Sequence, residues 1–581
     1  MAETYSHGFA APESAVARDA GRRTADVLID VLIDAGVEVV FGLPGGAIAP
    51  LNDALLDRPE VRVVTTRHES GAMFAAAAYA RTTGKLAVVL VTSGPGVYNA
   101  MTGLASAYCD GMPVLLIAGE VPRSVFGRRA LQEGSSHHLD IVTTCRPISK
   151  MAAQIPFADQ APSMLRQAIS TALTESRGPV VLTIPLDVLS KTIRAPRLAN
   201  DLRVVQRTDS LPMNDAIDEA ARALGSAKRP LIFVGSGARW DDGPERVREL
   251  AERLQAPVMT TPKAKGVFPE GHPLSLGVFG YGGHPSTTRY LERGVDALLT
   301  VGSSLGDVAT NGWSKLLSPS KHFIQIDVDA SQIGRNYPVT CGLIGSAGPL
   351  LERITAALPR QPRARRELGV ARFTDPSIDQ HGSEGRITPM RALWELQRAL
   401  PSNTRFTCDI GEHLLFAIHY IEAHDPEHFM VMTGLGSMGS SIAGALGVRL
   451  GANTPAAAIC GDGCFAMNLS DLAVAARERI PIVVAVLNDE RYGMVELGHE
   501  AIYGRTPEYP AGPMSVALMA RSVGADATTI EHNNEIAAVD FSGLREGRPL
   551  VLDIRIDRSV KMPKNGRFDD IKATAKTPAL N

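Results

Sequence analysis

Short apolar runs alternate with longer, helix-like segments along most of the chain, and they fall into three blocks. The first block spans residues 28–120 and contains runs such as VEVVFG, LAVVLV and MPVLLIAG; the second spans 212–357 and the third 404–556. Apolar runs of about four to eight residues that end in glycine or a polar residue, each followed by a helical segment, are typical of parallel strands joined by helices. We therefore predict an α/β protein with three doubly wound parallel-sheet domains.

Polar stretches separate the three blocks. Residues near 188–211 and near 359–386 are broken by charges, proline and glycine, which is typical of linkers. The alternation is missing at both ends of the chain, which are predicted to be tails. The predicted organisation is a tail (1–22), a first domain (23–190), a central domain (212–357), a third domain (388–560) and a second tail (561–581). The first and third domains have similar patterns, so we expect them to be structurally related.

Composition narrows the class of protein. The 581 residues match about three domains of ~100–200 residues each. The net charge is −3, both signs are mixed and no long basic patch is present, which argues against a nucleic-acid partner. There is no run of about 18 apolar residues and no signal-peptide pattern, so we expect neither a membrane span nor secretion. The six cysteines are scattered without a CxxC pair, which fits the cytoplasm.

Two neighbouring apolar runs in the third block end in oxygen-bearing residues. The run AAAIC ends at Gly461-Asp462-Gly463, a helix is predicted over 464–479, and the next run, PIVVAVL, ends at Asn488-Asp489. Parallel strands joined by a helix end at the same edge of a sheet, so these polar residues should converge. The glycines allow close backbone approach to a ligand, and a helix N-terminus suits phosphate. The alternative is an ordinary turn with a surface aspartate, but the paired strand ends favour Mg²⁺ bound to a diphosphate.

The same segment resembles the diphosphate-binding motif of thiamine diphosphate (ThDP) enzymes. The first block adds FGLPGGAIAPLNDAL, TRHESGAMFAAAAYARTTGK and VLVTSGPGVYNAMTGLASAYCDGMPVLLIAGEVP, which resemble the pyrimidine-binding domain of the acetolactate (acetohydroxyacid) synthase branch. TGLGSMGSSIAGALG resembles the loop that shapes the cofactor, and the resemblance covers about residues 23–560. It implies ThDP and Mg²⁺, decarboxylation of a 2-oxoacid with transfer to an acceptor carbonyl, and a site shared between subunits of a homodimer or homotetramer.

The resemblance assigns roles to individual residues. Glu69 takes the position of the carboxylate that shares a proton with the cofactor, and Gln132 that of a side chain near the reacting carbon. Met438 would support the bent cofactor, and the carbonyl of Gly436 would accept a hydrogen bond from it. DIGEHLL resembles a second diphosphate loop. The remaining implied cofactor contacts are Gly45, Gly46, Asn99, Gly411, His413, Gly461, Gly463, Cys464 and Met494. The implied metal ligands are Asp462, Asp489 and the backbone carbonyl of Arg491.

This chain departs from the family pattern at several positions. The second metal position holds Asp489 instead of asparagine, and Glu412 stands where a glutamine is usual. Gly498 replaces a tryptophan that borders the acceptor, so the acceptor pocket should take bulky substrates. ALQEGSSHHLDIVTTCRPISK resembles the loop that carries the glutamine and a downstream lysine, which assigns Lys150 to the acceptor pocket as well. Ser303 stands where FAD-containing relatives have an arginine, which argues against FAD, although FVGSGARWDD could approach an ADP moiety.

Alternatives remain open at this point. His137-His138 would suit the acid–base pair of a decarboxylase, while a solvated loop is the simpler interpretation. Gln132 favours a carboligase over a non-ligating decarboxylase or acyloin lyase. A ThDP-binding subunit without turnover is a third possibility, against which Glu69, Asp462 and Met438 argue. The sequence does not identify the substrates.

Overall fold

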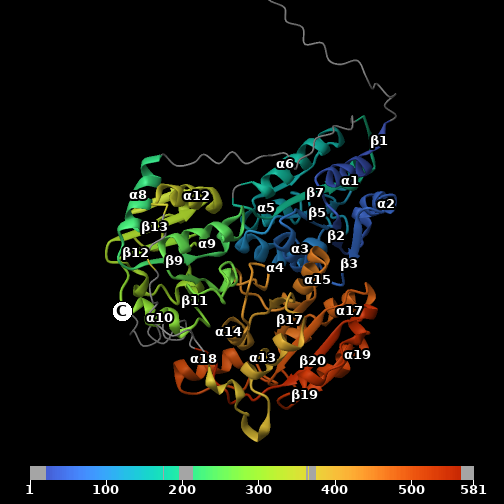
Figure 1. Cartoon of the computed structure of the whole chain (residues 1–581). Coiled ribbons are helices and arrows are strands. Elements are labelled where there is room, and N and C mark those ends of the chain that lie inside the picture. Colours follow the sequence, from blue (N-terminus) through green and yellow to red (C-terminus); the bar gives the residue numbers. More distant parts are fainter. Residues whose placement is uncertain (1–20, 175, 195–213, 361–363, 365–374, 564–581) are drawn as a thin grey trace, which may run out of the picture.

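The computed structural model describes residues 21–174, 176–194, 214–360, 364 and 375–563. The predicted tails lie almost entirely outside these residues, as do most of the predicted linkers. Among the described residues, three six-stranded sheets are present, and every strand pair in them is parallel. Each sheet belongs to one of the three predicted blocks, and Figure 1 shows them as three lobes. The prediction of an α/β fold with three parallel sheets is confirmed.

The first sheet has the strand order β3-β2-β4-β5-β7-β6. Its strands are β2 (Val39–Gly42), β3 (Arg62–Thr65), β4 (Ala87–Val91), β5 (Val114–Glu120), β6 (Met151–Gln154) and β7 (Val180–Pro185). Its helices are α1 (Thr24–Asp34), α2 (Ala49–Leu56), α3 (Glu69–Thr83), α4 (Pro95–Asp110), α5 (Ile141–Cys145), α6 (Ala161–Leu173) and α7 (Leu186–Ser190). A short antiparallel pair, β1 (Arg22–Arg23) with β8 (Thr192–Ile193), joins the two ends of this unit.

The central sheet has the order β11-β10-β9-β12-β13-β14. Its strands are β9 (Pro230–Val234), β10 (Val258–Thr260), β11 (Ser275–Val278), β12 (Ala297–Val301), β13 (His322–Asp327) and β14 (Cys341–Ile344). Its helices are α8 (Asn214–Ser226), α9 (Gly243–Leu254), α10 (Pro285–Leu291), α11 (Asp307–Thr310) and α12 (Ala347–Ala357). With the strands numbered one to six in chain order, this is the 3-2-1-4-5-6 order of dinucleotide-binding folds.

The third sheet has the order β16-β15-β17-β18-β20-β19. Its strands are β15 (Arg405–Cys408), β16 (Phe429–Val431), β17 (Ala456–Gly461), β18 (Val483–Asn488), β19 (Asp526–Ile530) and β20 (Leu550–Arg555). Its helices are α13 (Pro389–Ala399), α14 (Glu412–Tyr420), α15 (Ser441–Ala452), α16 (Asp462–Met467), α17 (Leu469–Arg477), α18 (Gly493–Tyr503) and α19 (Val516–Ser522). Numbered in chain order, the first and third sheets both read 2-1-3-4-6-5, so the expected relationship between them is confirmed.

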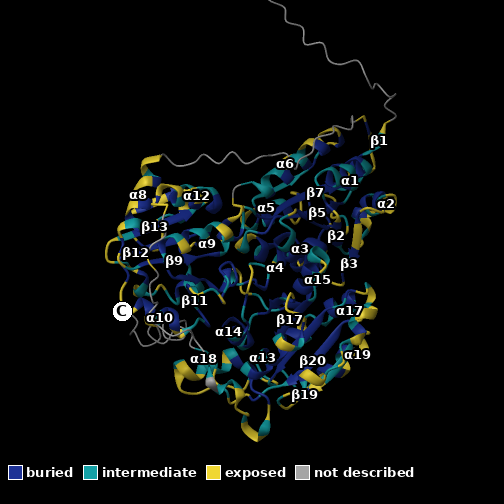
Figure 2. Cartoon of the chain, viewed as in Figure 1, coloured by how far each residue is buried: buried dark blue, intermediate teal, exposed yellow. Residues whose placement is uncertain are grey.

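The first and third sheets share one apolar core. Helices α3 and α15 pack against each other across this core, and both lie near the centre of Figure 1. Every residue of α3 from Gly71 to Arg81 is buried (Figure 2). A Cβ atom on Gly447 of α15 would lie only 2.1 Å from the carbonyl oxygen of Ala75 on α3. The alanine and glycine residues therefore bring the two helices together backbone to backbone.

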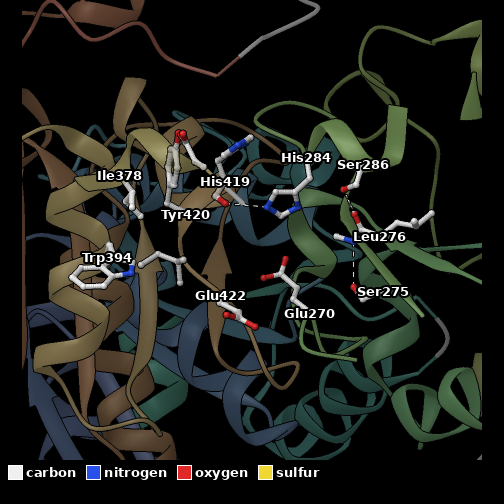
Figure 3. Close-up of a pocket in the computed structure, with 13 residues that line it drawn as sticks. Glu270, Ser275, Leu276, His284, Ser286, Ile378, Trp394, His419, Tyr420 and Glu422 are labelled. Carbon is white, nitrogen blue, oxygen red and sulfur yellow. Dashed lines mark hydrogen bonds between the residues drawn. The ribbon is translucent and has the colours of Figure 1, made fainter. Parts of the chain in front are cut away.

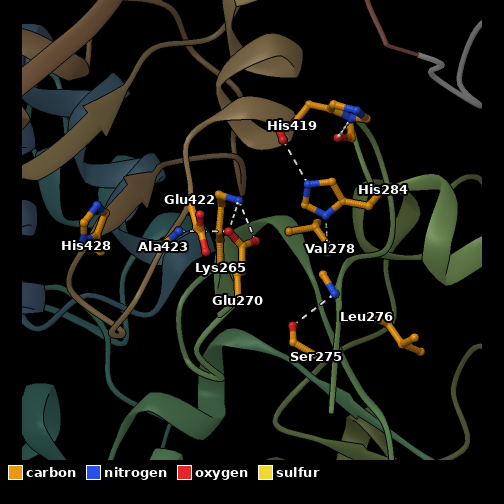
Figure 4. A network of polar contacts seen from close by, with 12 residues as sticks. Lys265, Glu270, Ser275, Leu276, Val278, His284, His419, Glu422, Ala423 and His428 are labelled. Atoms are coloured by element: carbon orange, nitrogen blue, oxygen red, sulfur yellow. Dashed lines mark hydrogen bonds and ion pairs between the residues drawn. The ribbon is translucent and has the colours of Figure 1, made fainter. Parts of the chain in front are cut away.

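The central and third units meet at a buried ion pair. Lys265 Nζ donates to both carboxylate oxygens of Glu270 at 2.6 and 2.8 Å, and Glu270 also accepts from the backbone N–H of Ala423 at 2.9 Å (Figure 4). Nearby, His284 donates to the carbonyl of His419 across the same junction. Figure 3 shows the pocket that opens between these segments. These bonds join the central unit to α14 and the loop that follows it.

One sequence prediction about the fold is wrong in detail. The expected helix over 464–479 is divided into α16 and α17 at Asn468, and α16 already begins at Asp462. The side chain of Asn468 donates to the carbonyl of Cys464, and it packs so closely against Gly439 that a Cβ there would lie 1.9 Å from Asn468 Nδ2. Among the described residues, no helix has the length and apolar character needed to cross a membrane.

Candidate active site

The carboxyl ends of β17 and β18 form one edge of the third sheet, as the sequence predicts. The two strands are adjacent and parallel, with Gly461 opposite Leu487. A pocket lies at this edge, between the loops that follow β15, β17 and β18 and the loop before α15. All the predicted cofactor and metal residues of the third unit line it: Gly411, His413, Gly436, Met438, Gly461, Asp462, Gly463, Cys464, Asp489, Arg491 and Met494.

Asp462 is the most deeply buried acidic group that lines this pocket. Its residue is 2% exposed, and its Oδ2 atom has no hydrogen-bond partner among the described residues. Burial, followed by the nearby charge of Asp489, raises the pKa of Asp462 to about 7. A buried carboxylate oxygen without a partner is costly, and a cation would supply the missing interaction. The environment of Asp462 therefore fits a bound divalent metal.

His413 offers a second unsatisfied group in the same pocket. Its Nε2 atom is buried and has no partner among the described residues, and burial lowers the pKa of its imidazole to about 4. The ring packs against Gly411 and Gly461, where Cβ atoms would lie 2.4 and 3.1 Å from it. A neutral imidazole can donate one hydrogen bond to a phosphate oxygen. The histidine and the glycine-rich turns around it thus fit a diphosphate group.

Asn488 and Asp489 have different surroundings although they are adjacent. Asn488 is buried in β18 and donates to Asp553 Oδ1 at 2.8 Å, so its amide helps to hold β20. Asp489 points into the pocket, where its Oδ2 accepts from Arg491 Nε at 2.8 Å. Burial raises the pKa of Asp489 above its ordinary value, and the bond from Arg491 opposes this shift. In the described residues no group of three or more His, Cys, Asp or Glu side chains is arranged to hold a metal, so a metal here needs backbone and diphosphate oxygens as well.

Glu69 lies at the carboxyl edge of the first sheet. It is the first residue of α3, it is 3% exposed, and its Oε2 accepts from Asn99 Nδ2 at 3.1 Å. A carboxylate at a helix N-terminus is favoured by the helix dipole. The predicted glycines Gly45 and Gly46 lie between β2 and α2, and a Cβ at Gly45 would lie 2.5 Å from the side chain of Thr92. The first unit thus presents a carboxylate and a close backbone turn.

Gln132 lies in a loop that is held in place by a hydrogen bond to a buried glutamate, which the sequence did not predict. Its backbone has a φ of +65°, its side chain is exposed, and its Oε1 accepts from Thr92 Oγ1 at 3.4 Å. The neighbouring Gly134 N–H donates to Glu120 Oε1 at 3.0 Å. Glu120 is fully buried at the end of β5, its Oε2 atom has no partner among the described residues, and burial raises its pKa. Sequence analysis missed Glu120, although an acidic residue closing the apolar run LLIAGE was a usable signal.

The other predicted residues are more scattered. Gly498 is buried in α18, one turn beyond the pocket-lining residues Met494 and Val495, but it does not itself line the pocket. Lys150 donates to the backbone carbonyls of Thr171 and Thr174 at 2.5 and 2.7 Å. Both carbonyls lie at the C-terminal end of α6, so the amine of Lys150 holds that end of the helix.

The histidine pair and Ser303 lie outside this pocket. His137 and His138 are both exposed. Ser303 is buried beside Gly235 at the carboxyl edge of the central sheet, and its hydroxyl accepts from Leu305 N. The positions of these residues therefore do not test the decarboxylase alternative or the prediction that FAD is absent.

The described residues form an α/β protein of three parallel sheets, and the glycine-rich, carboxylate-lined pocket at the edge of the third sheet fits a metal-bound diphosphate. Family models identify it further: residues 22–141 match the N-terminal TPP (thiamine pyrophosphate) binding domain of thiamine pyrophosphate enzymes, 217–354 the central domain, and 409–554 the C-terminal TPP binding domain. The chain therefore belongs to the thiamine pyrophosphate enzyme family.

Curated relatives point to one branch of this family. The chain is 32% identical over 572 residues to a probable acetolactate synthase large subunit of Methanocaldococcus jannaschii, covering 94% of each chain. It is 33% identical over 553 residues to an acetolactate synthase of Arthrospira platensis, covering 92% of this chain and 94% of the relative. It is 30% identical over 553 residues to acetolactate synthase isozyme 3 large subunit of Escherichia coli, covering 92% and 95%. The resemblance to the acetolactate synthase branch is confirmed.

Proposed function

We propose that this protein is a ThDP- and Mg²⁺-dependent enzyme that decarboxylates a 2-oxoacid and joins the remaining acyl group to an acceptor carbonyl. The observation that carries this proposal is the composition of the pocket at the edge of the third sheet. It gathers eleven residues that sequence motifs alone assign to one cofactor. The acetolactate synthases among the relatives support the carboligation step.

The residues of this chain divide the work between the two cofactor-binding units. Bound ThDP would supply the carbon nucleophile for the reaction with the 2-oxoacid. Asp462 and Asp489, with the backbone carbonyl of Arg491, would hold Mg²⁺ at the diphosphate. Glu69 would hold and move a proton at the far end of the cofactor, where its burial excludes competing water. Met438 would keep the cofactor bent, and Gln132 would orient the substrate.

We also propose that the enzyme is at least a homodimer whose active sites lie between subunits. Three exposed apolar side chains lie in the same part of the first unit as Gln132: Tyr98, Leu131 and Leu139. Three more, Leu435, Met467 and Val495, accompany the pocket of the third unit. Exposed apolar side chains around a site indicate a surface that contacts another protein. A second copy placed over both edges would bring Glu69 of one chain to the pocket of the other.

We also propose a large acceptor substrate and a reaction that does not use flavin. The missing indole at Gly498, one turn beyond Val495, favours an acceptor bulkier than pyruvate. Ser303 offers no cation to a flavin, so we propose that catalysis needs no FAD. A protein that is colourless after gel filtration agrees with this, whereas stoichiometric flavin absorbance contradicts it.

One experiment tests the reaction directly. Purified protein is incubated with ThDP, Mg²⁺ and a panel of 2-oxoacids, each alone and together with aldehyde or 2-oxoacid acceptors, and the products are identified by mass. Joined hydroxyketone or hydroxyacid products support carboligation. Release of free aldehyde alone identifies a non-ligating decarboxylase, and ThDP binding without any product identifies a subunit that does not turn over.

A further inference from the structure

Three carboxylates and one guanidinium crowd the mouth of the pocket near the start of α18. Arg491 Nε donates to Asp489 Oδ2 at 2.8 Å. Its Nη1 lies 3.5 Å from Glu496 Oε2, and its Nη2 lies 3.9 Å from Glu412 Oε2. Asp462 lines the same pocket, which adds a fourth acidic group. Arg491 is the one basic side chain among the described residues that line this pocket, apart from the neutral His413.

The arrangement around Arg491 is tightly built. A Cβ atom on Gly493 would lie 2.3 Å from Glu412 Oε2, 3.0 Å from Asp489 Oδ2 and 3.3 Å from Arg491 Nε. Three charged side chains therefore pack closely around Gly493, and a larger residue there would displace them. Arg491 Nη2 also donates to the carbonyl of Arg558 at 2.8 Å, which anchors the guanidinium from the side of β20. The guanidinium is thus fixed by partners on four sides.

The charge of the site explains why such a group is needed. A diphosphate carries more negative charge than one Mg²⁺ neutralises, so each uncompensated carboxylate in the pocket repels the complex. Asp489 adds one negative charge compared with an amide ligand, and Glu412 adds another. An aspartate paired with a guanidinium through one oxygen presents nearly the net charge of an amide, and its second oxygen stays available as a metal ligand.

We propose that the side chain of Arg491 is the internal counter-ion of the metal site. It is a positioning residue that neutralises Asp489, turns that carboxylate toward the metal, and keeps Glu412 from repelling the diphosphate. The proposal rests on the proposed function in that the ligand is ThDP with Mg²⁺. It adds to the metal-ligand role of the Arg491 backbone carbonyl, because the side chain and the carbonyl act on different partners.

A double-mutant cycle tests the coupling between the two residues. The full-length variants Arg491→Met, Asp489→Asn and D489N/R491M are titrated calorimetrically with ThDP at fixed Mg²⁺, and with Mg²⁺ at fixed ThDP. Arg491→Met should weaken binding by about 10–100-fold, as for loss of a group that orients a metal ligand. The double variant should regain part of this loss and bind several-fold more tightly than Arg491→Met, because the charge of Asp489 is gone while that of Glu412 stays uncompensated.

Arg555 provides the matched control. It pairs with Glu490 Oε1 at 2.8 Å in the loop after β18 and with Asp553 Oδ2 at 3.0 Å on its own strand, β20, but it does not line the pocket. Arg555→Met should leave ThDP binding unchanged. Melting temperatures without ligand show whether each variant folds, and Arg491→Gln with D489N/R491Q replaces the methionine pair if that pair does not fold.

The outcomes separate this proposal from the proposed function. If wild type binds ThDP and Arg491→Met binds it equally well, the counter-ion role is overturned while the function stands. A double variant as weak as Arg491→Met also overturns it, because the arginine would then not act by neutralising Asp489. A wild-type protein that binds no ThDP in the presence of Mg²⁺ rejects the proposed function itself.

Discussion

The buried carboxylate of Glu69 gives the sharpest test of the proposed catalytic machinery. Glu69→Gln keeps the size and the hydrogen-bonding capacity of the side chain but removes its ability to exchange a proton. In the structure Glu69 is 3% exposed and accepts one hydrogen bond, from Asn99 Nδ2. A glutamine can accept the same bond through its amide oxygen, so the fold should tolerate the substitution.

The expected effects on stability and on activity differ in size. The bond from Asn99 changes from charge-assisted to neutral and the helix dipole loses its carboxylate, which together cost ~1–2 kcal/mol of unfolding free energy. For a protein of this length that corresponds to a melting-temperature decrease of only a few degrees. Loss of a positioned acid–base group costs about 10²–10⁴-fold in rate. This is about 3–5 kcal/mol of activation free energy, since each tenfold is 1.36 kcal/mol.

Three measurements on the same preparation separate these effects. Substrate consumption gives the turnover rate, calorimetry gives the ThDP affinity, and thermal unfolding gives the stability. We expect a rate that falls by at least about 100-fold while affinity and melting temperature stay close to wild type. Asn99→Ala serves as a companion variant, because it removes the donor and keeps the acid. A Glu69→Gln enzyme that turns over at a rate near that of wild type would refute the assignment.

Three further perturbations have defined outcomes. Asp462→Ala should weaken Mg²⁺-dependent ThDP binding by roughly 100-fold or more, and equal retention of ThDP in a binding assay contradicts the proposed metal site. Burial raises the pKa of Asp471 to about 7, so the folded state keeps a proton that the unfolded chain releases above about pH 4. The free energy of unfolding should therefore fall by up to ~4 kcal/mol as pH rises from about 4 to 7. Asp471→Asn should recover part of this loss above about pH 7 but change little at about pH 4. Melting curves with the same pH dependence in both proteins would exclude this. Gly498→Trp should lower kcat/KM for a bulky acceptor by about 10–200-fold while sparing decarboxylation of the donor, and unchanged selectivity in competition assays would show that another group closes the space.

The edge of the third sheet could be predicted from the sequence because local signals determine it. Apolar runs that end at Asp462 and Asp489 are joined by one helical segment, and parallel strands then leave no choice about where their ends meet. The structure gathers the motif residues of that unit in one pocket accordingly. The relationship between the first and third domains was likewise visible as a similar sequence pattern, whereas their common strand order was seen only in the structure.

Features that depend on distant partners could not be predicted. The break at Asn468 depends on Gly439, and the amine of Lys150 is held by carbonyls beyond the middle of α6. The apolar run before Glu120 was a usable signal for that residue, but the hydrogen bond that it accepts from Gly134 forms only on folding. The charge cluster around Arg491 depends on Gly493, Glu412 and Glu496, which come together only when α14 and α18 face each other. Motifs reveal the ligands of a site, whereas their supporting contacts come from tertiary packing.

The seam between α3 and α15 has a mechanical consequence. At Gly447 the backbones of the two helices are in direct contact, so sliding one helix along the other would make backbone atoms collide. The two cofactor-binding sheets of one chain therefore move as a single block. In the proposed dimer this block carries Glu69 for one active site and the metal pocket for the other, so the spacing between the two sites is fixed. We therefore expect α18 to move when substrate enters, because only Gly493 and Gly498 of that helix are buried. Motion coupled to turnover should be measured there.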